Sequence, residues 1–98
     1  MLDIIKKRCY IVSNIYDDEI HSLINACMQD CISCGVSKAS FDKNQNLMYD
    51  DLVITAIVSY VKAMRGNDRT DTAVYLGIYQ SIRDKMTQDS TYMVSSNE

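Results

Sequence analysis

Apolar residues recur every three to four positions along most of the chain, which is the pattern of amphipathic helices. Four stretches follow it: a short one from Leu2 to about Val12, and longer ones that open at Asp17, at Asp50-Asp51 and near Thr70. Since the sequence has no proline and three glycines, long helices are favoured over many short elements. The pattern predicts an all-α fold, a small bundle of three main helices with a short N-terminal helix.

The stretch that opens at Asp17 has one apolar stripe along a single helix face. Acids at its start complement the positive end of the helix dipole, with Asp17 as the expected N-cap. Gly35 stands where a left-handed residue usually ends a helix. The stripe consists of Ile20, Leu23, Ile24, Cys27, Cys31 and Cys34.

The third stretch is apolar around most of its circumference, as expected of the central helix of a bundle or of an oligomer interface. Gly66 is expected at its C′ position. The side chains that should be buried here are Leu52, Ile57, Val61 and Met64, against Ile20, Leu23, Ile24, Ile78 and Ile82 of the neighbouring helices.

The fourth stretch, to about Met86, has a glycine in its middle, Gly77, which predicts a close helix contact. Its stripe consists of Tyr75, Ile78, Tyr79, Ile82 and Met86. Residues 1–86 are therefore expected to form a single helical domain, followed by a flexible C-terminal tail over 87–98. A long loop, residues 36–47, separates the second and third helices. Its one large apolar side chain near the middle, Phe41, is expected either to pack in the core or to bind in a partner protein.

Composition narrows the possible functions. The formal net charge is −3, whereas a protein that holds nucleic acid by its phosphates usually has a basic face. No apolar run approaches the roughly 20 residues of a membrane span. The order of charges in the first twelve residues differs from that of a secretory signal, so a soluble intracellular protein is expected.

No catalytic, cofactor or metal site is expected. Cys27, Cys31 and Cys34 share a helix face with apolar residues, so they are interpreted as reduced core thiols rather than zinc ligands. His21 is interpreted as a solvated side chain, because no nucleophile or orienting partner accompanies it. The acidic pairs fit helix capping, and the basic residues of the first stretch, Lys6, Lys7 and Arg8, fit a solvated face.

Two segments carry a resemblance to a known family. The first is Tyr16-Asp-Asp-Glu-Ile-x-x-Leu-Ile-x-Ala-Cys27. The second is Asp50-Asp-Leu-Val-Ile-x-Ala-Ile-Val-x-Tyr-Val-Lys-Ala63, followed by Gly66-Asn-Asp-x-x-Asp71, Tyr79-x-x-Ile82 and Ser90-Thr-Tyr92. Together they resemble the small head–tail connector (adaptor, or head-completion) proteins of long-tailed bacteriophages and prophages, those of Gram-positive hosts above all. The resemblance spans roughly residues 2 to 92; Arg69-Thr70 departs from the Asn-Pro that relatives often have.

The resemblance implies a structural protein with no catalytic residues and no cofactor. Such proteins form a ring of about a dozen copies under the portal protein, extend the DNA channel after packaging and offer a docking surface to the next connector or tail-completion protein. DNA passes without sequence-specific binding, and no membrane is involved. The chain is then expected in the host cytoplasm during assembly and in the virion at the head–tail junction.

Two segments are expected to act as assembly contacts. Phe41, and separately the apolar triplet Tyr92-Met93-Val94 in the polar tail, should be mobile in the free protein and pack on a neighbouring subunit or the portal. The alternatives are a small helical DNA-binding or regulatory protein and a metal-binding module. A DNA-binding helix-turn-helix needs a short turn and a basic recognition helix, which this sequence does not provide.

Overall fold

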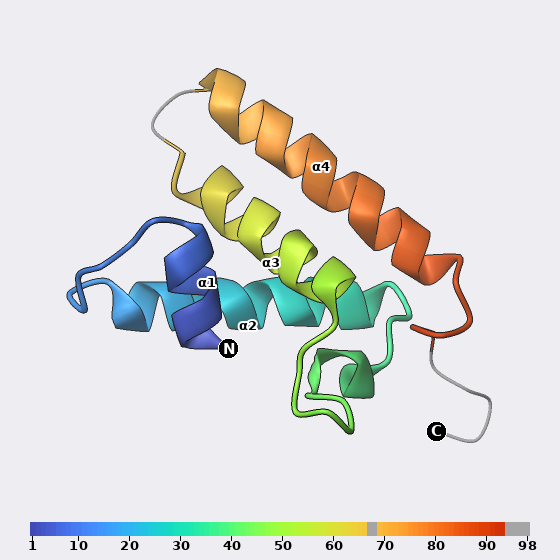
Figure 1. Ribbon diagram of the computed structural model, residues 1–98. Coiled ribbons are helices and arrows are strands. Elements are labelled where there is room, and N and C mark those ends of the chain that lie inside the picture. The colour runs from blue at the N-terminus through green and yellow to red at the C-terminus, as the bar shows by residue number, and fades with distance from the viewer. Residues whose placement is uncertain (67–68, 94–98) are drawn as a thin grey trace.

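The computed structural model describes residues 1–66 and 69–93, and the described part is helical (Figure 1). The helices are α1 (Leu2–Arg8), α2 (Asp17–Ser33), α3 (Asp51–Met64) and α4 (Arg69–Thr87), with a short 3₁₀ helix, η1 (Lys38–Phe41), between α2 and α3. The described residues contain one isolated β-bridge and no named strand. The predicted all-α class is confirmed.

The third helix lies in the middle of the fold. Figure 1 shows α4 running alongside α3 in the opposite direction, while α1 and α2 cover the other side of α3. Ile57 and Val61 are fully buried in the core between these layers. The core also includes Ile5, Ile20, Ile24, Cys27, Cys31, Val36, Phe41, Val53, Ile54, Ala56, Tyr79, Ile82 and Met86.

Two residues expected in this core are exposed. Met64 is 45% exposed and Ile78 is also solvent-accessible, so both predictions were wrong. Met64 is the last residue of α3, where the chain leaves the bundle, and Ile78 lies beside the α4 face that packs on α3. Leu52 and Leu23 are partly buried against the core.

The helix ends follow capping rules in part. The carboxylate of Asp50 accepts hydrogen bonds from the backbone N–H groups of Leu52 (2.9 Å) and Val53 (3.2 Å), so the predicted acid cap of α3 is confirmed. Gly35 has φ +105° and ends α2 as expected. The N-cap of α2, however, is Tyr16 without a side-chain hydrogen bond, because Asp17 pairs with Lys6 instead.

Gly66 occupies the expected C′ position, directly after the C-cap Arg65 of α3, whereas Gly77 differs from the expectation. Gly66 does not have a positive φ; a Cβ there would meet Thr72 Oγ1 at 2.6 Å, so a close approach of α4 restricts the position. Gly77 is exposed, and a Cβ there would meet no described atom within 4 Å. The close helix contact predicted at Gly77 is therefore absent from the described part of the chain.

The N-terminal helix is shorter than the apolar pattern predicts. It ends at Arg8, and Tyr10 adopts a positive φ of 58° that turns the chain away. Val12 is consequently 96% exposed rather than part of the stripe. Cys34 is exposed too, since it caps the end of α2 at the edge of the core.

Candidate assembly surfaces

Phe41 belongs to the core of its own chain. Its side chain is 3% exposed at the end of η1, a turn whose N-cap, Ser37, accepts a hydrogen bond from Ala39 N (3.2 Å). Of the two positions considered from the sequence, the core position is the one observed. The expectation of a mobile Phe41 that awaits a partner is corrected, because a side chain buried this deeply has almost no surface to offer.

The C-terminal segment 89–93 folds back onto the domain. Ser37 N donates to the carbonyl oxygen of Tyr92 (2.6 Å), and Val36 forms an antiparallel bridge with Met93. The Tyr92 hydroxyl donates to the carboxylate of Asp50 (2.9 Å to Oδ2). Tyr92 and Met93 are partly buried rather than free, so the ordered domain extends past residue 86; Val94 lies outside the described residues.

The contact between Tyr92 and Asp50 joins the C-terminal segment to the start of α3. Burial, together with the hydrogen bond to the Asp50 carboxylate, raises the pKa of Tyr92 to about 12. The same carboxylate caps α3, so one aspartate serves two functions. Its position links the C-terminal segment to the core helix.

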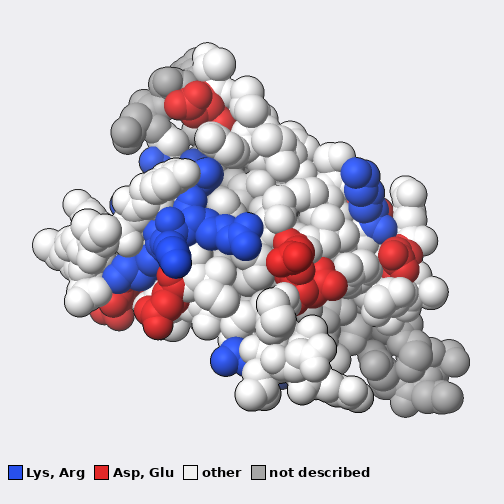
Figure 2. Space-filling view, viewed as in Figure 1, with Lys and Arg blue, Asp and Glu red and all other residues white. Residues whose placement is uncertain are grey.

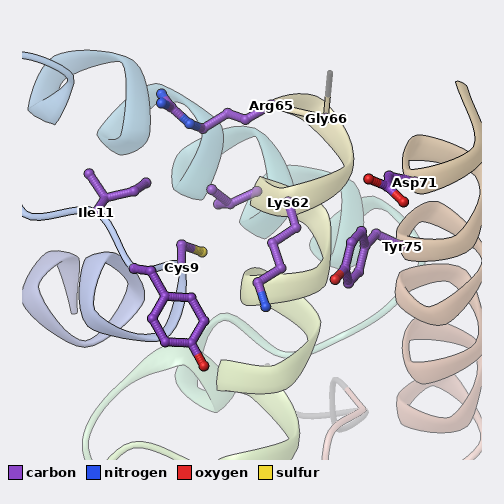
Figure 3. Close-up of a pocket in the computed structure, with 9 residues that line it drawn as sticks. Cys9, Ile11, Lys62, Arg65, Gly66, Asp71 and Tyr75 are labelled. Atoms are coloured by element: carbon purple, nitrogen blue, oxygen red, sulfur yellow. The ribbon is translucent and has the colours of Figure 1, made fainter. Parts of the chain in front are cut away.

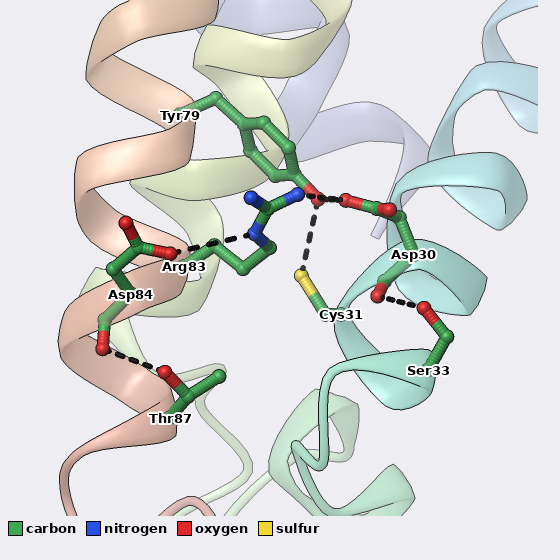
Figure 4. Close-up of polar contacts among 7 residues, drawn as sticks. All are labelled: Asp30, Cys31, Ser33, Tyr79, Arg83, Asp84 and Thr87. Atoms are coloured by element: carbon green, nitrogen blue, oxygen red, sulfur yellow. Dashed lines mark hydrogen bonds and ion pairs between the residues drawn. The ribbon is translucent and has the colours of Figure 1, made fainter.

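A polar cluster joins α2 to α4 (Figure 4). Tyr79 donates its hydroxyl to Asp30 Oδ2, and Arg83 Nη1 donates to the same oxygen (2.8 Å). The hydrogen bond from Tyr79, with help from Arg83, lowers the pKa of Asp30. Burial and the bond to Asp30 raise the pKa of Tyr79, so the phenol stays protonated and neutral. The cluster fixes the position of α4 relative to α2.

The cysteines are free thiols. Cys27 and Cys31 are fully buried, and Cys31 Sγ lies 3.4 Å from the Tyr79 hydroxyl. A contact with Cys31 and burial raise the pKa of Cys27. Within the part of the chain that the structure describes, no group of His, Cys, Asp and Glu side chains could hold a metal ion, and His21 is exposed. Nor is any described helix both long enough and apolar enough to cross a bilayer.

Positive charge gathers on one part of the surface. Figure 2 shows Lys and Arg side chains over α1 and the C-terminal end of α3. One of the three basic residues of α1, Lys6, is buried rather than solvated as expected; its Nζ lies 2.8 Å from Asp17 Oδ1 and donates to Asn14 Oδ1 (2.7 Å). These contacts hold residues 9–16, here called the N-terminal loop, against the ends of α1 and α2.

The N-terminal loop presents large apolar side chains to solvent. Its backbone is tied down by Lys6 and by the bond from Ile11 N to the carbonyl oxygen of Lys6 (2.9 Å). The side chains are exposed nonetheless: Tyr10, Val12, Ile15 and Tyr16. These exposed apolar side chains make the N-terminal loop a candidate contact surface.

A second apolar group lies on the turn that precedes α3, residues 44–48. Leu47 is 77% exposed and Met48 is 62% exposed. Asn44 holds the turn together: its side-chain oxygen accepts from Met48 N (3.1 Å) and its backbone N–H donates to the Met48 carbonyl (2.7 Å). Leu47 adopts a positive φ of 60° there. The turn thus holds two apolar side chains outward at a cost in backbone strain.

A cavity of about 400 Å³ opens at the C-terminal end of α3, between the N-terminal loop and α4. Figure 3 shows Lys62 extending from α3 into it, with Cys9 and Ile11 on one side and Asp71 and Tyr75 of α4 on the other. The Lys62 ammonium lies 5.8 Å from the centre of the Tyr10 ring and 5.4 Å from that of Tyr75. Arg65 also lines this space, which is here called the α3 cavity.

Sequence reasoning missed these surfaces. The apolar pair Leu47-Met48 at the end of a polar loop was a usable signal, since such side chains need burial somewhere. The α3 cavity had no such signal, because its lining comes from three segments that meet only in the folded chain.

The described part of the chain is a small all-helical fold with several large apolar side chains exposed on its surface. A comparison with family models matches residues 1–93 to the phage connector proteins. The chain belongs to this family, which assigns it a structural role as a connector in phage assembly, at the head–tail junction and together with other head and tail proteins. No curated protein and no solved structure matches the chain.

Proposed function

We propose that copies of this chain form a ring of about a dozen subunits beneath the portal of the DNA-filled capsid. The ring extends the DNA channel and presents a docking surface to the next connector or tail-completion protein. The observation that carries the proposal is the family match across residues 1–93. Two exposed apolar surfaces on a chain of 98 residues support it, since a ring subunit needs contacts on two sides.

The charge of the chain is consistent with a conduit. Each phosphate that a protein neutralises adds affinity through counterion release, so a channel wall that lets DNA pass should hold few of them. A net charge of −3 favours free passage. The subunit then needs no catalytic step and no cofactor.

Tyr92 and Met93 remain in the proposed contact set, with Val94 beside them in the sequence. Tyr92 and Met93 are only partly buried on their own chain, which leaves surface for a neighbour or the portal. Phe41 leaves the set because it is buried.

A phage strain that lacks the gene for this chain tests the proposal. DNA-filled heads without tails should accumulate, and adding the purified protein to them in vitro should restore infectious particles. The protein should band with these heads in a gradient and not with empty capsids. Complete virions in the deletion strain would contradict the proposal, and tight binding to random duplex DNA in a gel shift would favour a regulatory protein instead.

A further inference from the structure

We propose that neighbouring copies in the ring exchange their C-terminal segments, so that residues 89–93 of one copy bind the next copy in place of its own segment. The inference rests on the proposed ring and names a contact that would hold it. It starts from the way in which this segment is attached to the fold. Figure 1 shows the chain turning back after α4 and running to the end of α2.

The segment is attached through Tyr92 and Met93. The residues that receive it, here called the seat, are Gly35, Val36, Ser37, Ser40 and Asp50. Within the described chain, the hydrogen bonds between seat and segment all involve Tyr92. Its carbonyl oxygen accepts from Ser37 N (2.6 Å), and its hydroxyl donates to Asp50 Oδ2 (2.9 Å). An attachment that depends on one residue can be released without breaking a helix.

The seat fits this segment closely. Met93 pairs with Val36 in the antiparallel bridge, and a Cβ at Gly35 would lie 3.0 Å from Met93 Cε, so the glycine leaves room for the methionine side chain. The structure therefore shows which chemistry the seat takes: a tyrosine hydroxyl that donates to Asp50, followed by a flexible apolar side chain. Every copy of the chain carries such a segment.

Seat and segment are each ordered by bonds of their own. Ser37 caps η1, and Asp50 caps α3. In the segment, Asp89 accepts from Tyr92 N (3.0 Å, to its carbonyl oxygen) and from Thr91 N (2.9 Å, to Oδ1). None of these bonds joins the seat to the segment, so all of them persist when the segment moves to another copy. Parts that are already ordered lose less conformational entropy on binding.

An empty seat would be unfavourable. Val36 is fully buried and Ser37 is 7% exposed while the segment is bound. Departure of the segment would uncover Val36 and leave the Ser37 N–H without its acceptor, which costs free energy. The same segment from a neighbour restores these contacts, so an exchange between identical copies has a low net cost. This argument favours a second copy over an unrelated partner as the occupant.

The exchange would link copies in one direction. The segment follows Gln88, an exposed residue directly after the last residue of α4, whereas the seat lies around the end of α2 and the start of α3. Each copy therefore gives one segment and receives one, through different parts of its surface. Repetition of such a heterologous contact closes a ring when the rotation between copies allows it.

Disulfide cross-linking distinguishes exchange from attachment within one copy. Val36 and Met93 form a pair that is flanked by the backbone hydrogen bond to the Tyr92 carbonyl. The Cα atoms of such a pair lie about 4.5 Å apart, which a disulfide can span. In a Cys9→Ser, Cys34→Ser background, whose remaining thiols are buried, the variants are Val36→Cys, Met93→Cys and the double variant. Circular dichroism checks that each variant is folded.

The free double variant should run as a monomer after mild oxidation, because its segment lies on its own chain. Bound to DNA-filled heads, it should give a ladder of dimers, trimers and larger species. A mixture of the two single variants on heads should give dimers and nothing longer, since each copy then has one new thiol. Each single variant alone is the matched control and should give no cross-link.

A second pair of cysteines avoids the buried position. Ser40 and Thr91 line a hollow of about 200 Å³ between the seat and the segment. Ser40→Cys and Thr91→Cys, joined by a short bismaleimide linker in the same background, should give the same ladder on heads.

Three results would overturn the exchange. Double variants that remain monomeric on heads would show that each segment stays on its own copy, and would leave the connector ring standing. A ladder that stops at dimers would show reciprocal exchange between two copies instead of a continuous order. Wild-type protein absent from heads would overturn the proposed ring and the exchange with it.

Discussion

At the scale of single residues, Asp30 joins two helices that are far apart in the sequence. One of its oxygens accepts hydrogen bonds from Tyr79 and Arg83, both on α4. The pKa of Asp30 is lowered by these contacts, which means that the folded state favours the charged carboxylate. Stability should therefore depend on its ionisation.

We expect Asp30→Asn to destabilise the protein more at neutral pH than in acid. The folded pKa of Asp30 lies below the unfolded value of about 3.9, so its contribution is present above that value and is lost as the pH falls through the folded pKa. Partial exposure of the carboxylate limits the loss at pH 7 to about 1 kcal/mol.

Urea denaturation at pH 7 and at pH 3 measures this difference. Asp84→Asn is the matched control, because Asp84 lies 3.8 Å from Arg83 Nε and is more exposed than Asp30. It should change the free energy of unfolding little at either pH. An Asp30→Asn effect of equal size at both pH values would contradict the assigned pKa shift.

At the scale of the elements, two glycines show when a helix requires this residue type and when it does not. Gly35 ends α2 with φ +105°, and a Cβ there would lie 3.0 Å from Met93 Cε. Gly77 lies inside α4 with open space around it. The first is required by backbone conformation, while nothing in the described part of the chain requires the second.

Substitution by alanine should therefore have opposite effects at these two positions. Gly77→Ala should raise stability by about 1 kcal/mol, since alanine favours the helix. Gly35→Ala should lower stability by roughly 1–2 kcal/mol, because of its strained backbone conformation. Thermal unfolding of both variants, followed by circular dichroism, measures the effects. A destabilised Gly77→Ala would indicate a close contact that the single chain does not show.

At the scale of the whole molecule, α3 is the element on which the others pack. Figure 1 shows α4 on one side of α3 and α1 and α2 on the other, and the α3 residue Ile57 is fully buried. The loss of α3 would therefore remove a packing partner of α1, α2 and α4 at once.

Ile57→Asp should unfold the chain. Burying an unpaired carboxylate costs several kcal/mol, which is comparable to the total stability of a domain of this size. Thr55→Asp places the same side chain on the exposed face of α3 and should leave the fold intact. The measurement is the cooperativity of thermal unfolding. A cooperative transition in Ile57→Asp at the wild-type temperature would show that α3 is not the central helix.

Part of the fold could be predicted from the sequence because it depends on neighbours along the chain. The 3.6-residue period indicates the helices, the side chain of Asp50 caps the backbone N–H groups directly after it in α3, and Gly35 ends α2. The family resemblance likewise depended on residues read in order, and the family match over residues 1–93 confirms it.

Tertiary contacts decided the rest, since they depend on which segments meet. The apolar pattern predicted that the first helix continues to about Val12. In the structure α1 ends sooner, and Lys6 binds Asn14 and Asp17 of the segment that follows it. The pattern also left Phe41 open between core and partner, and packing placed it in the core.

The candidate contact surfaces show the same division. The sequence by itself determined the helices, their caps and an apolar central helix, because these follow from local hydrogen bonding and hydrophobic period. Only the tertiary structure decided that Tyr92 returns to Asp50 and that three distant segments enclose the α3 cavity. Whether a side chain is buried depends on which segments of the folded chain pack on it. The hydrophobic period of one segment does not specify which other segment that will be.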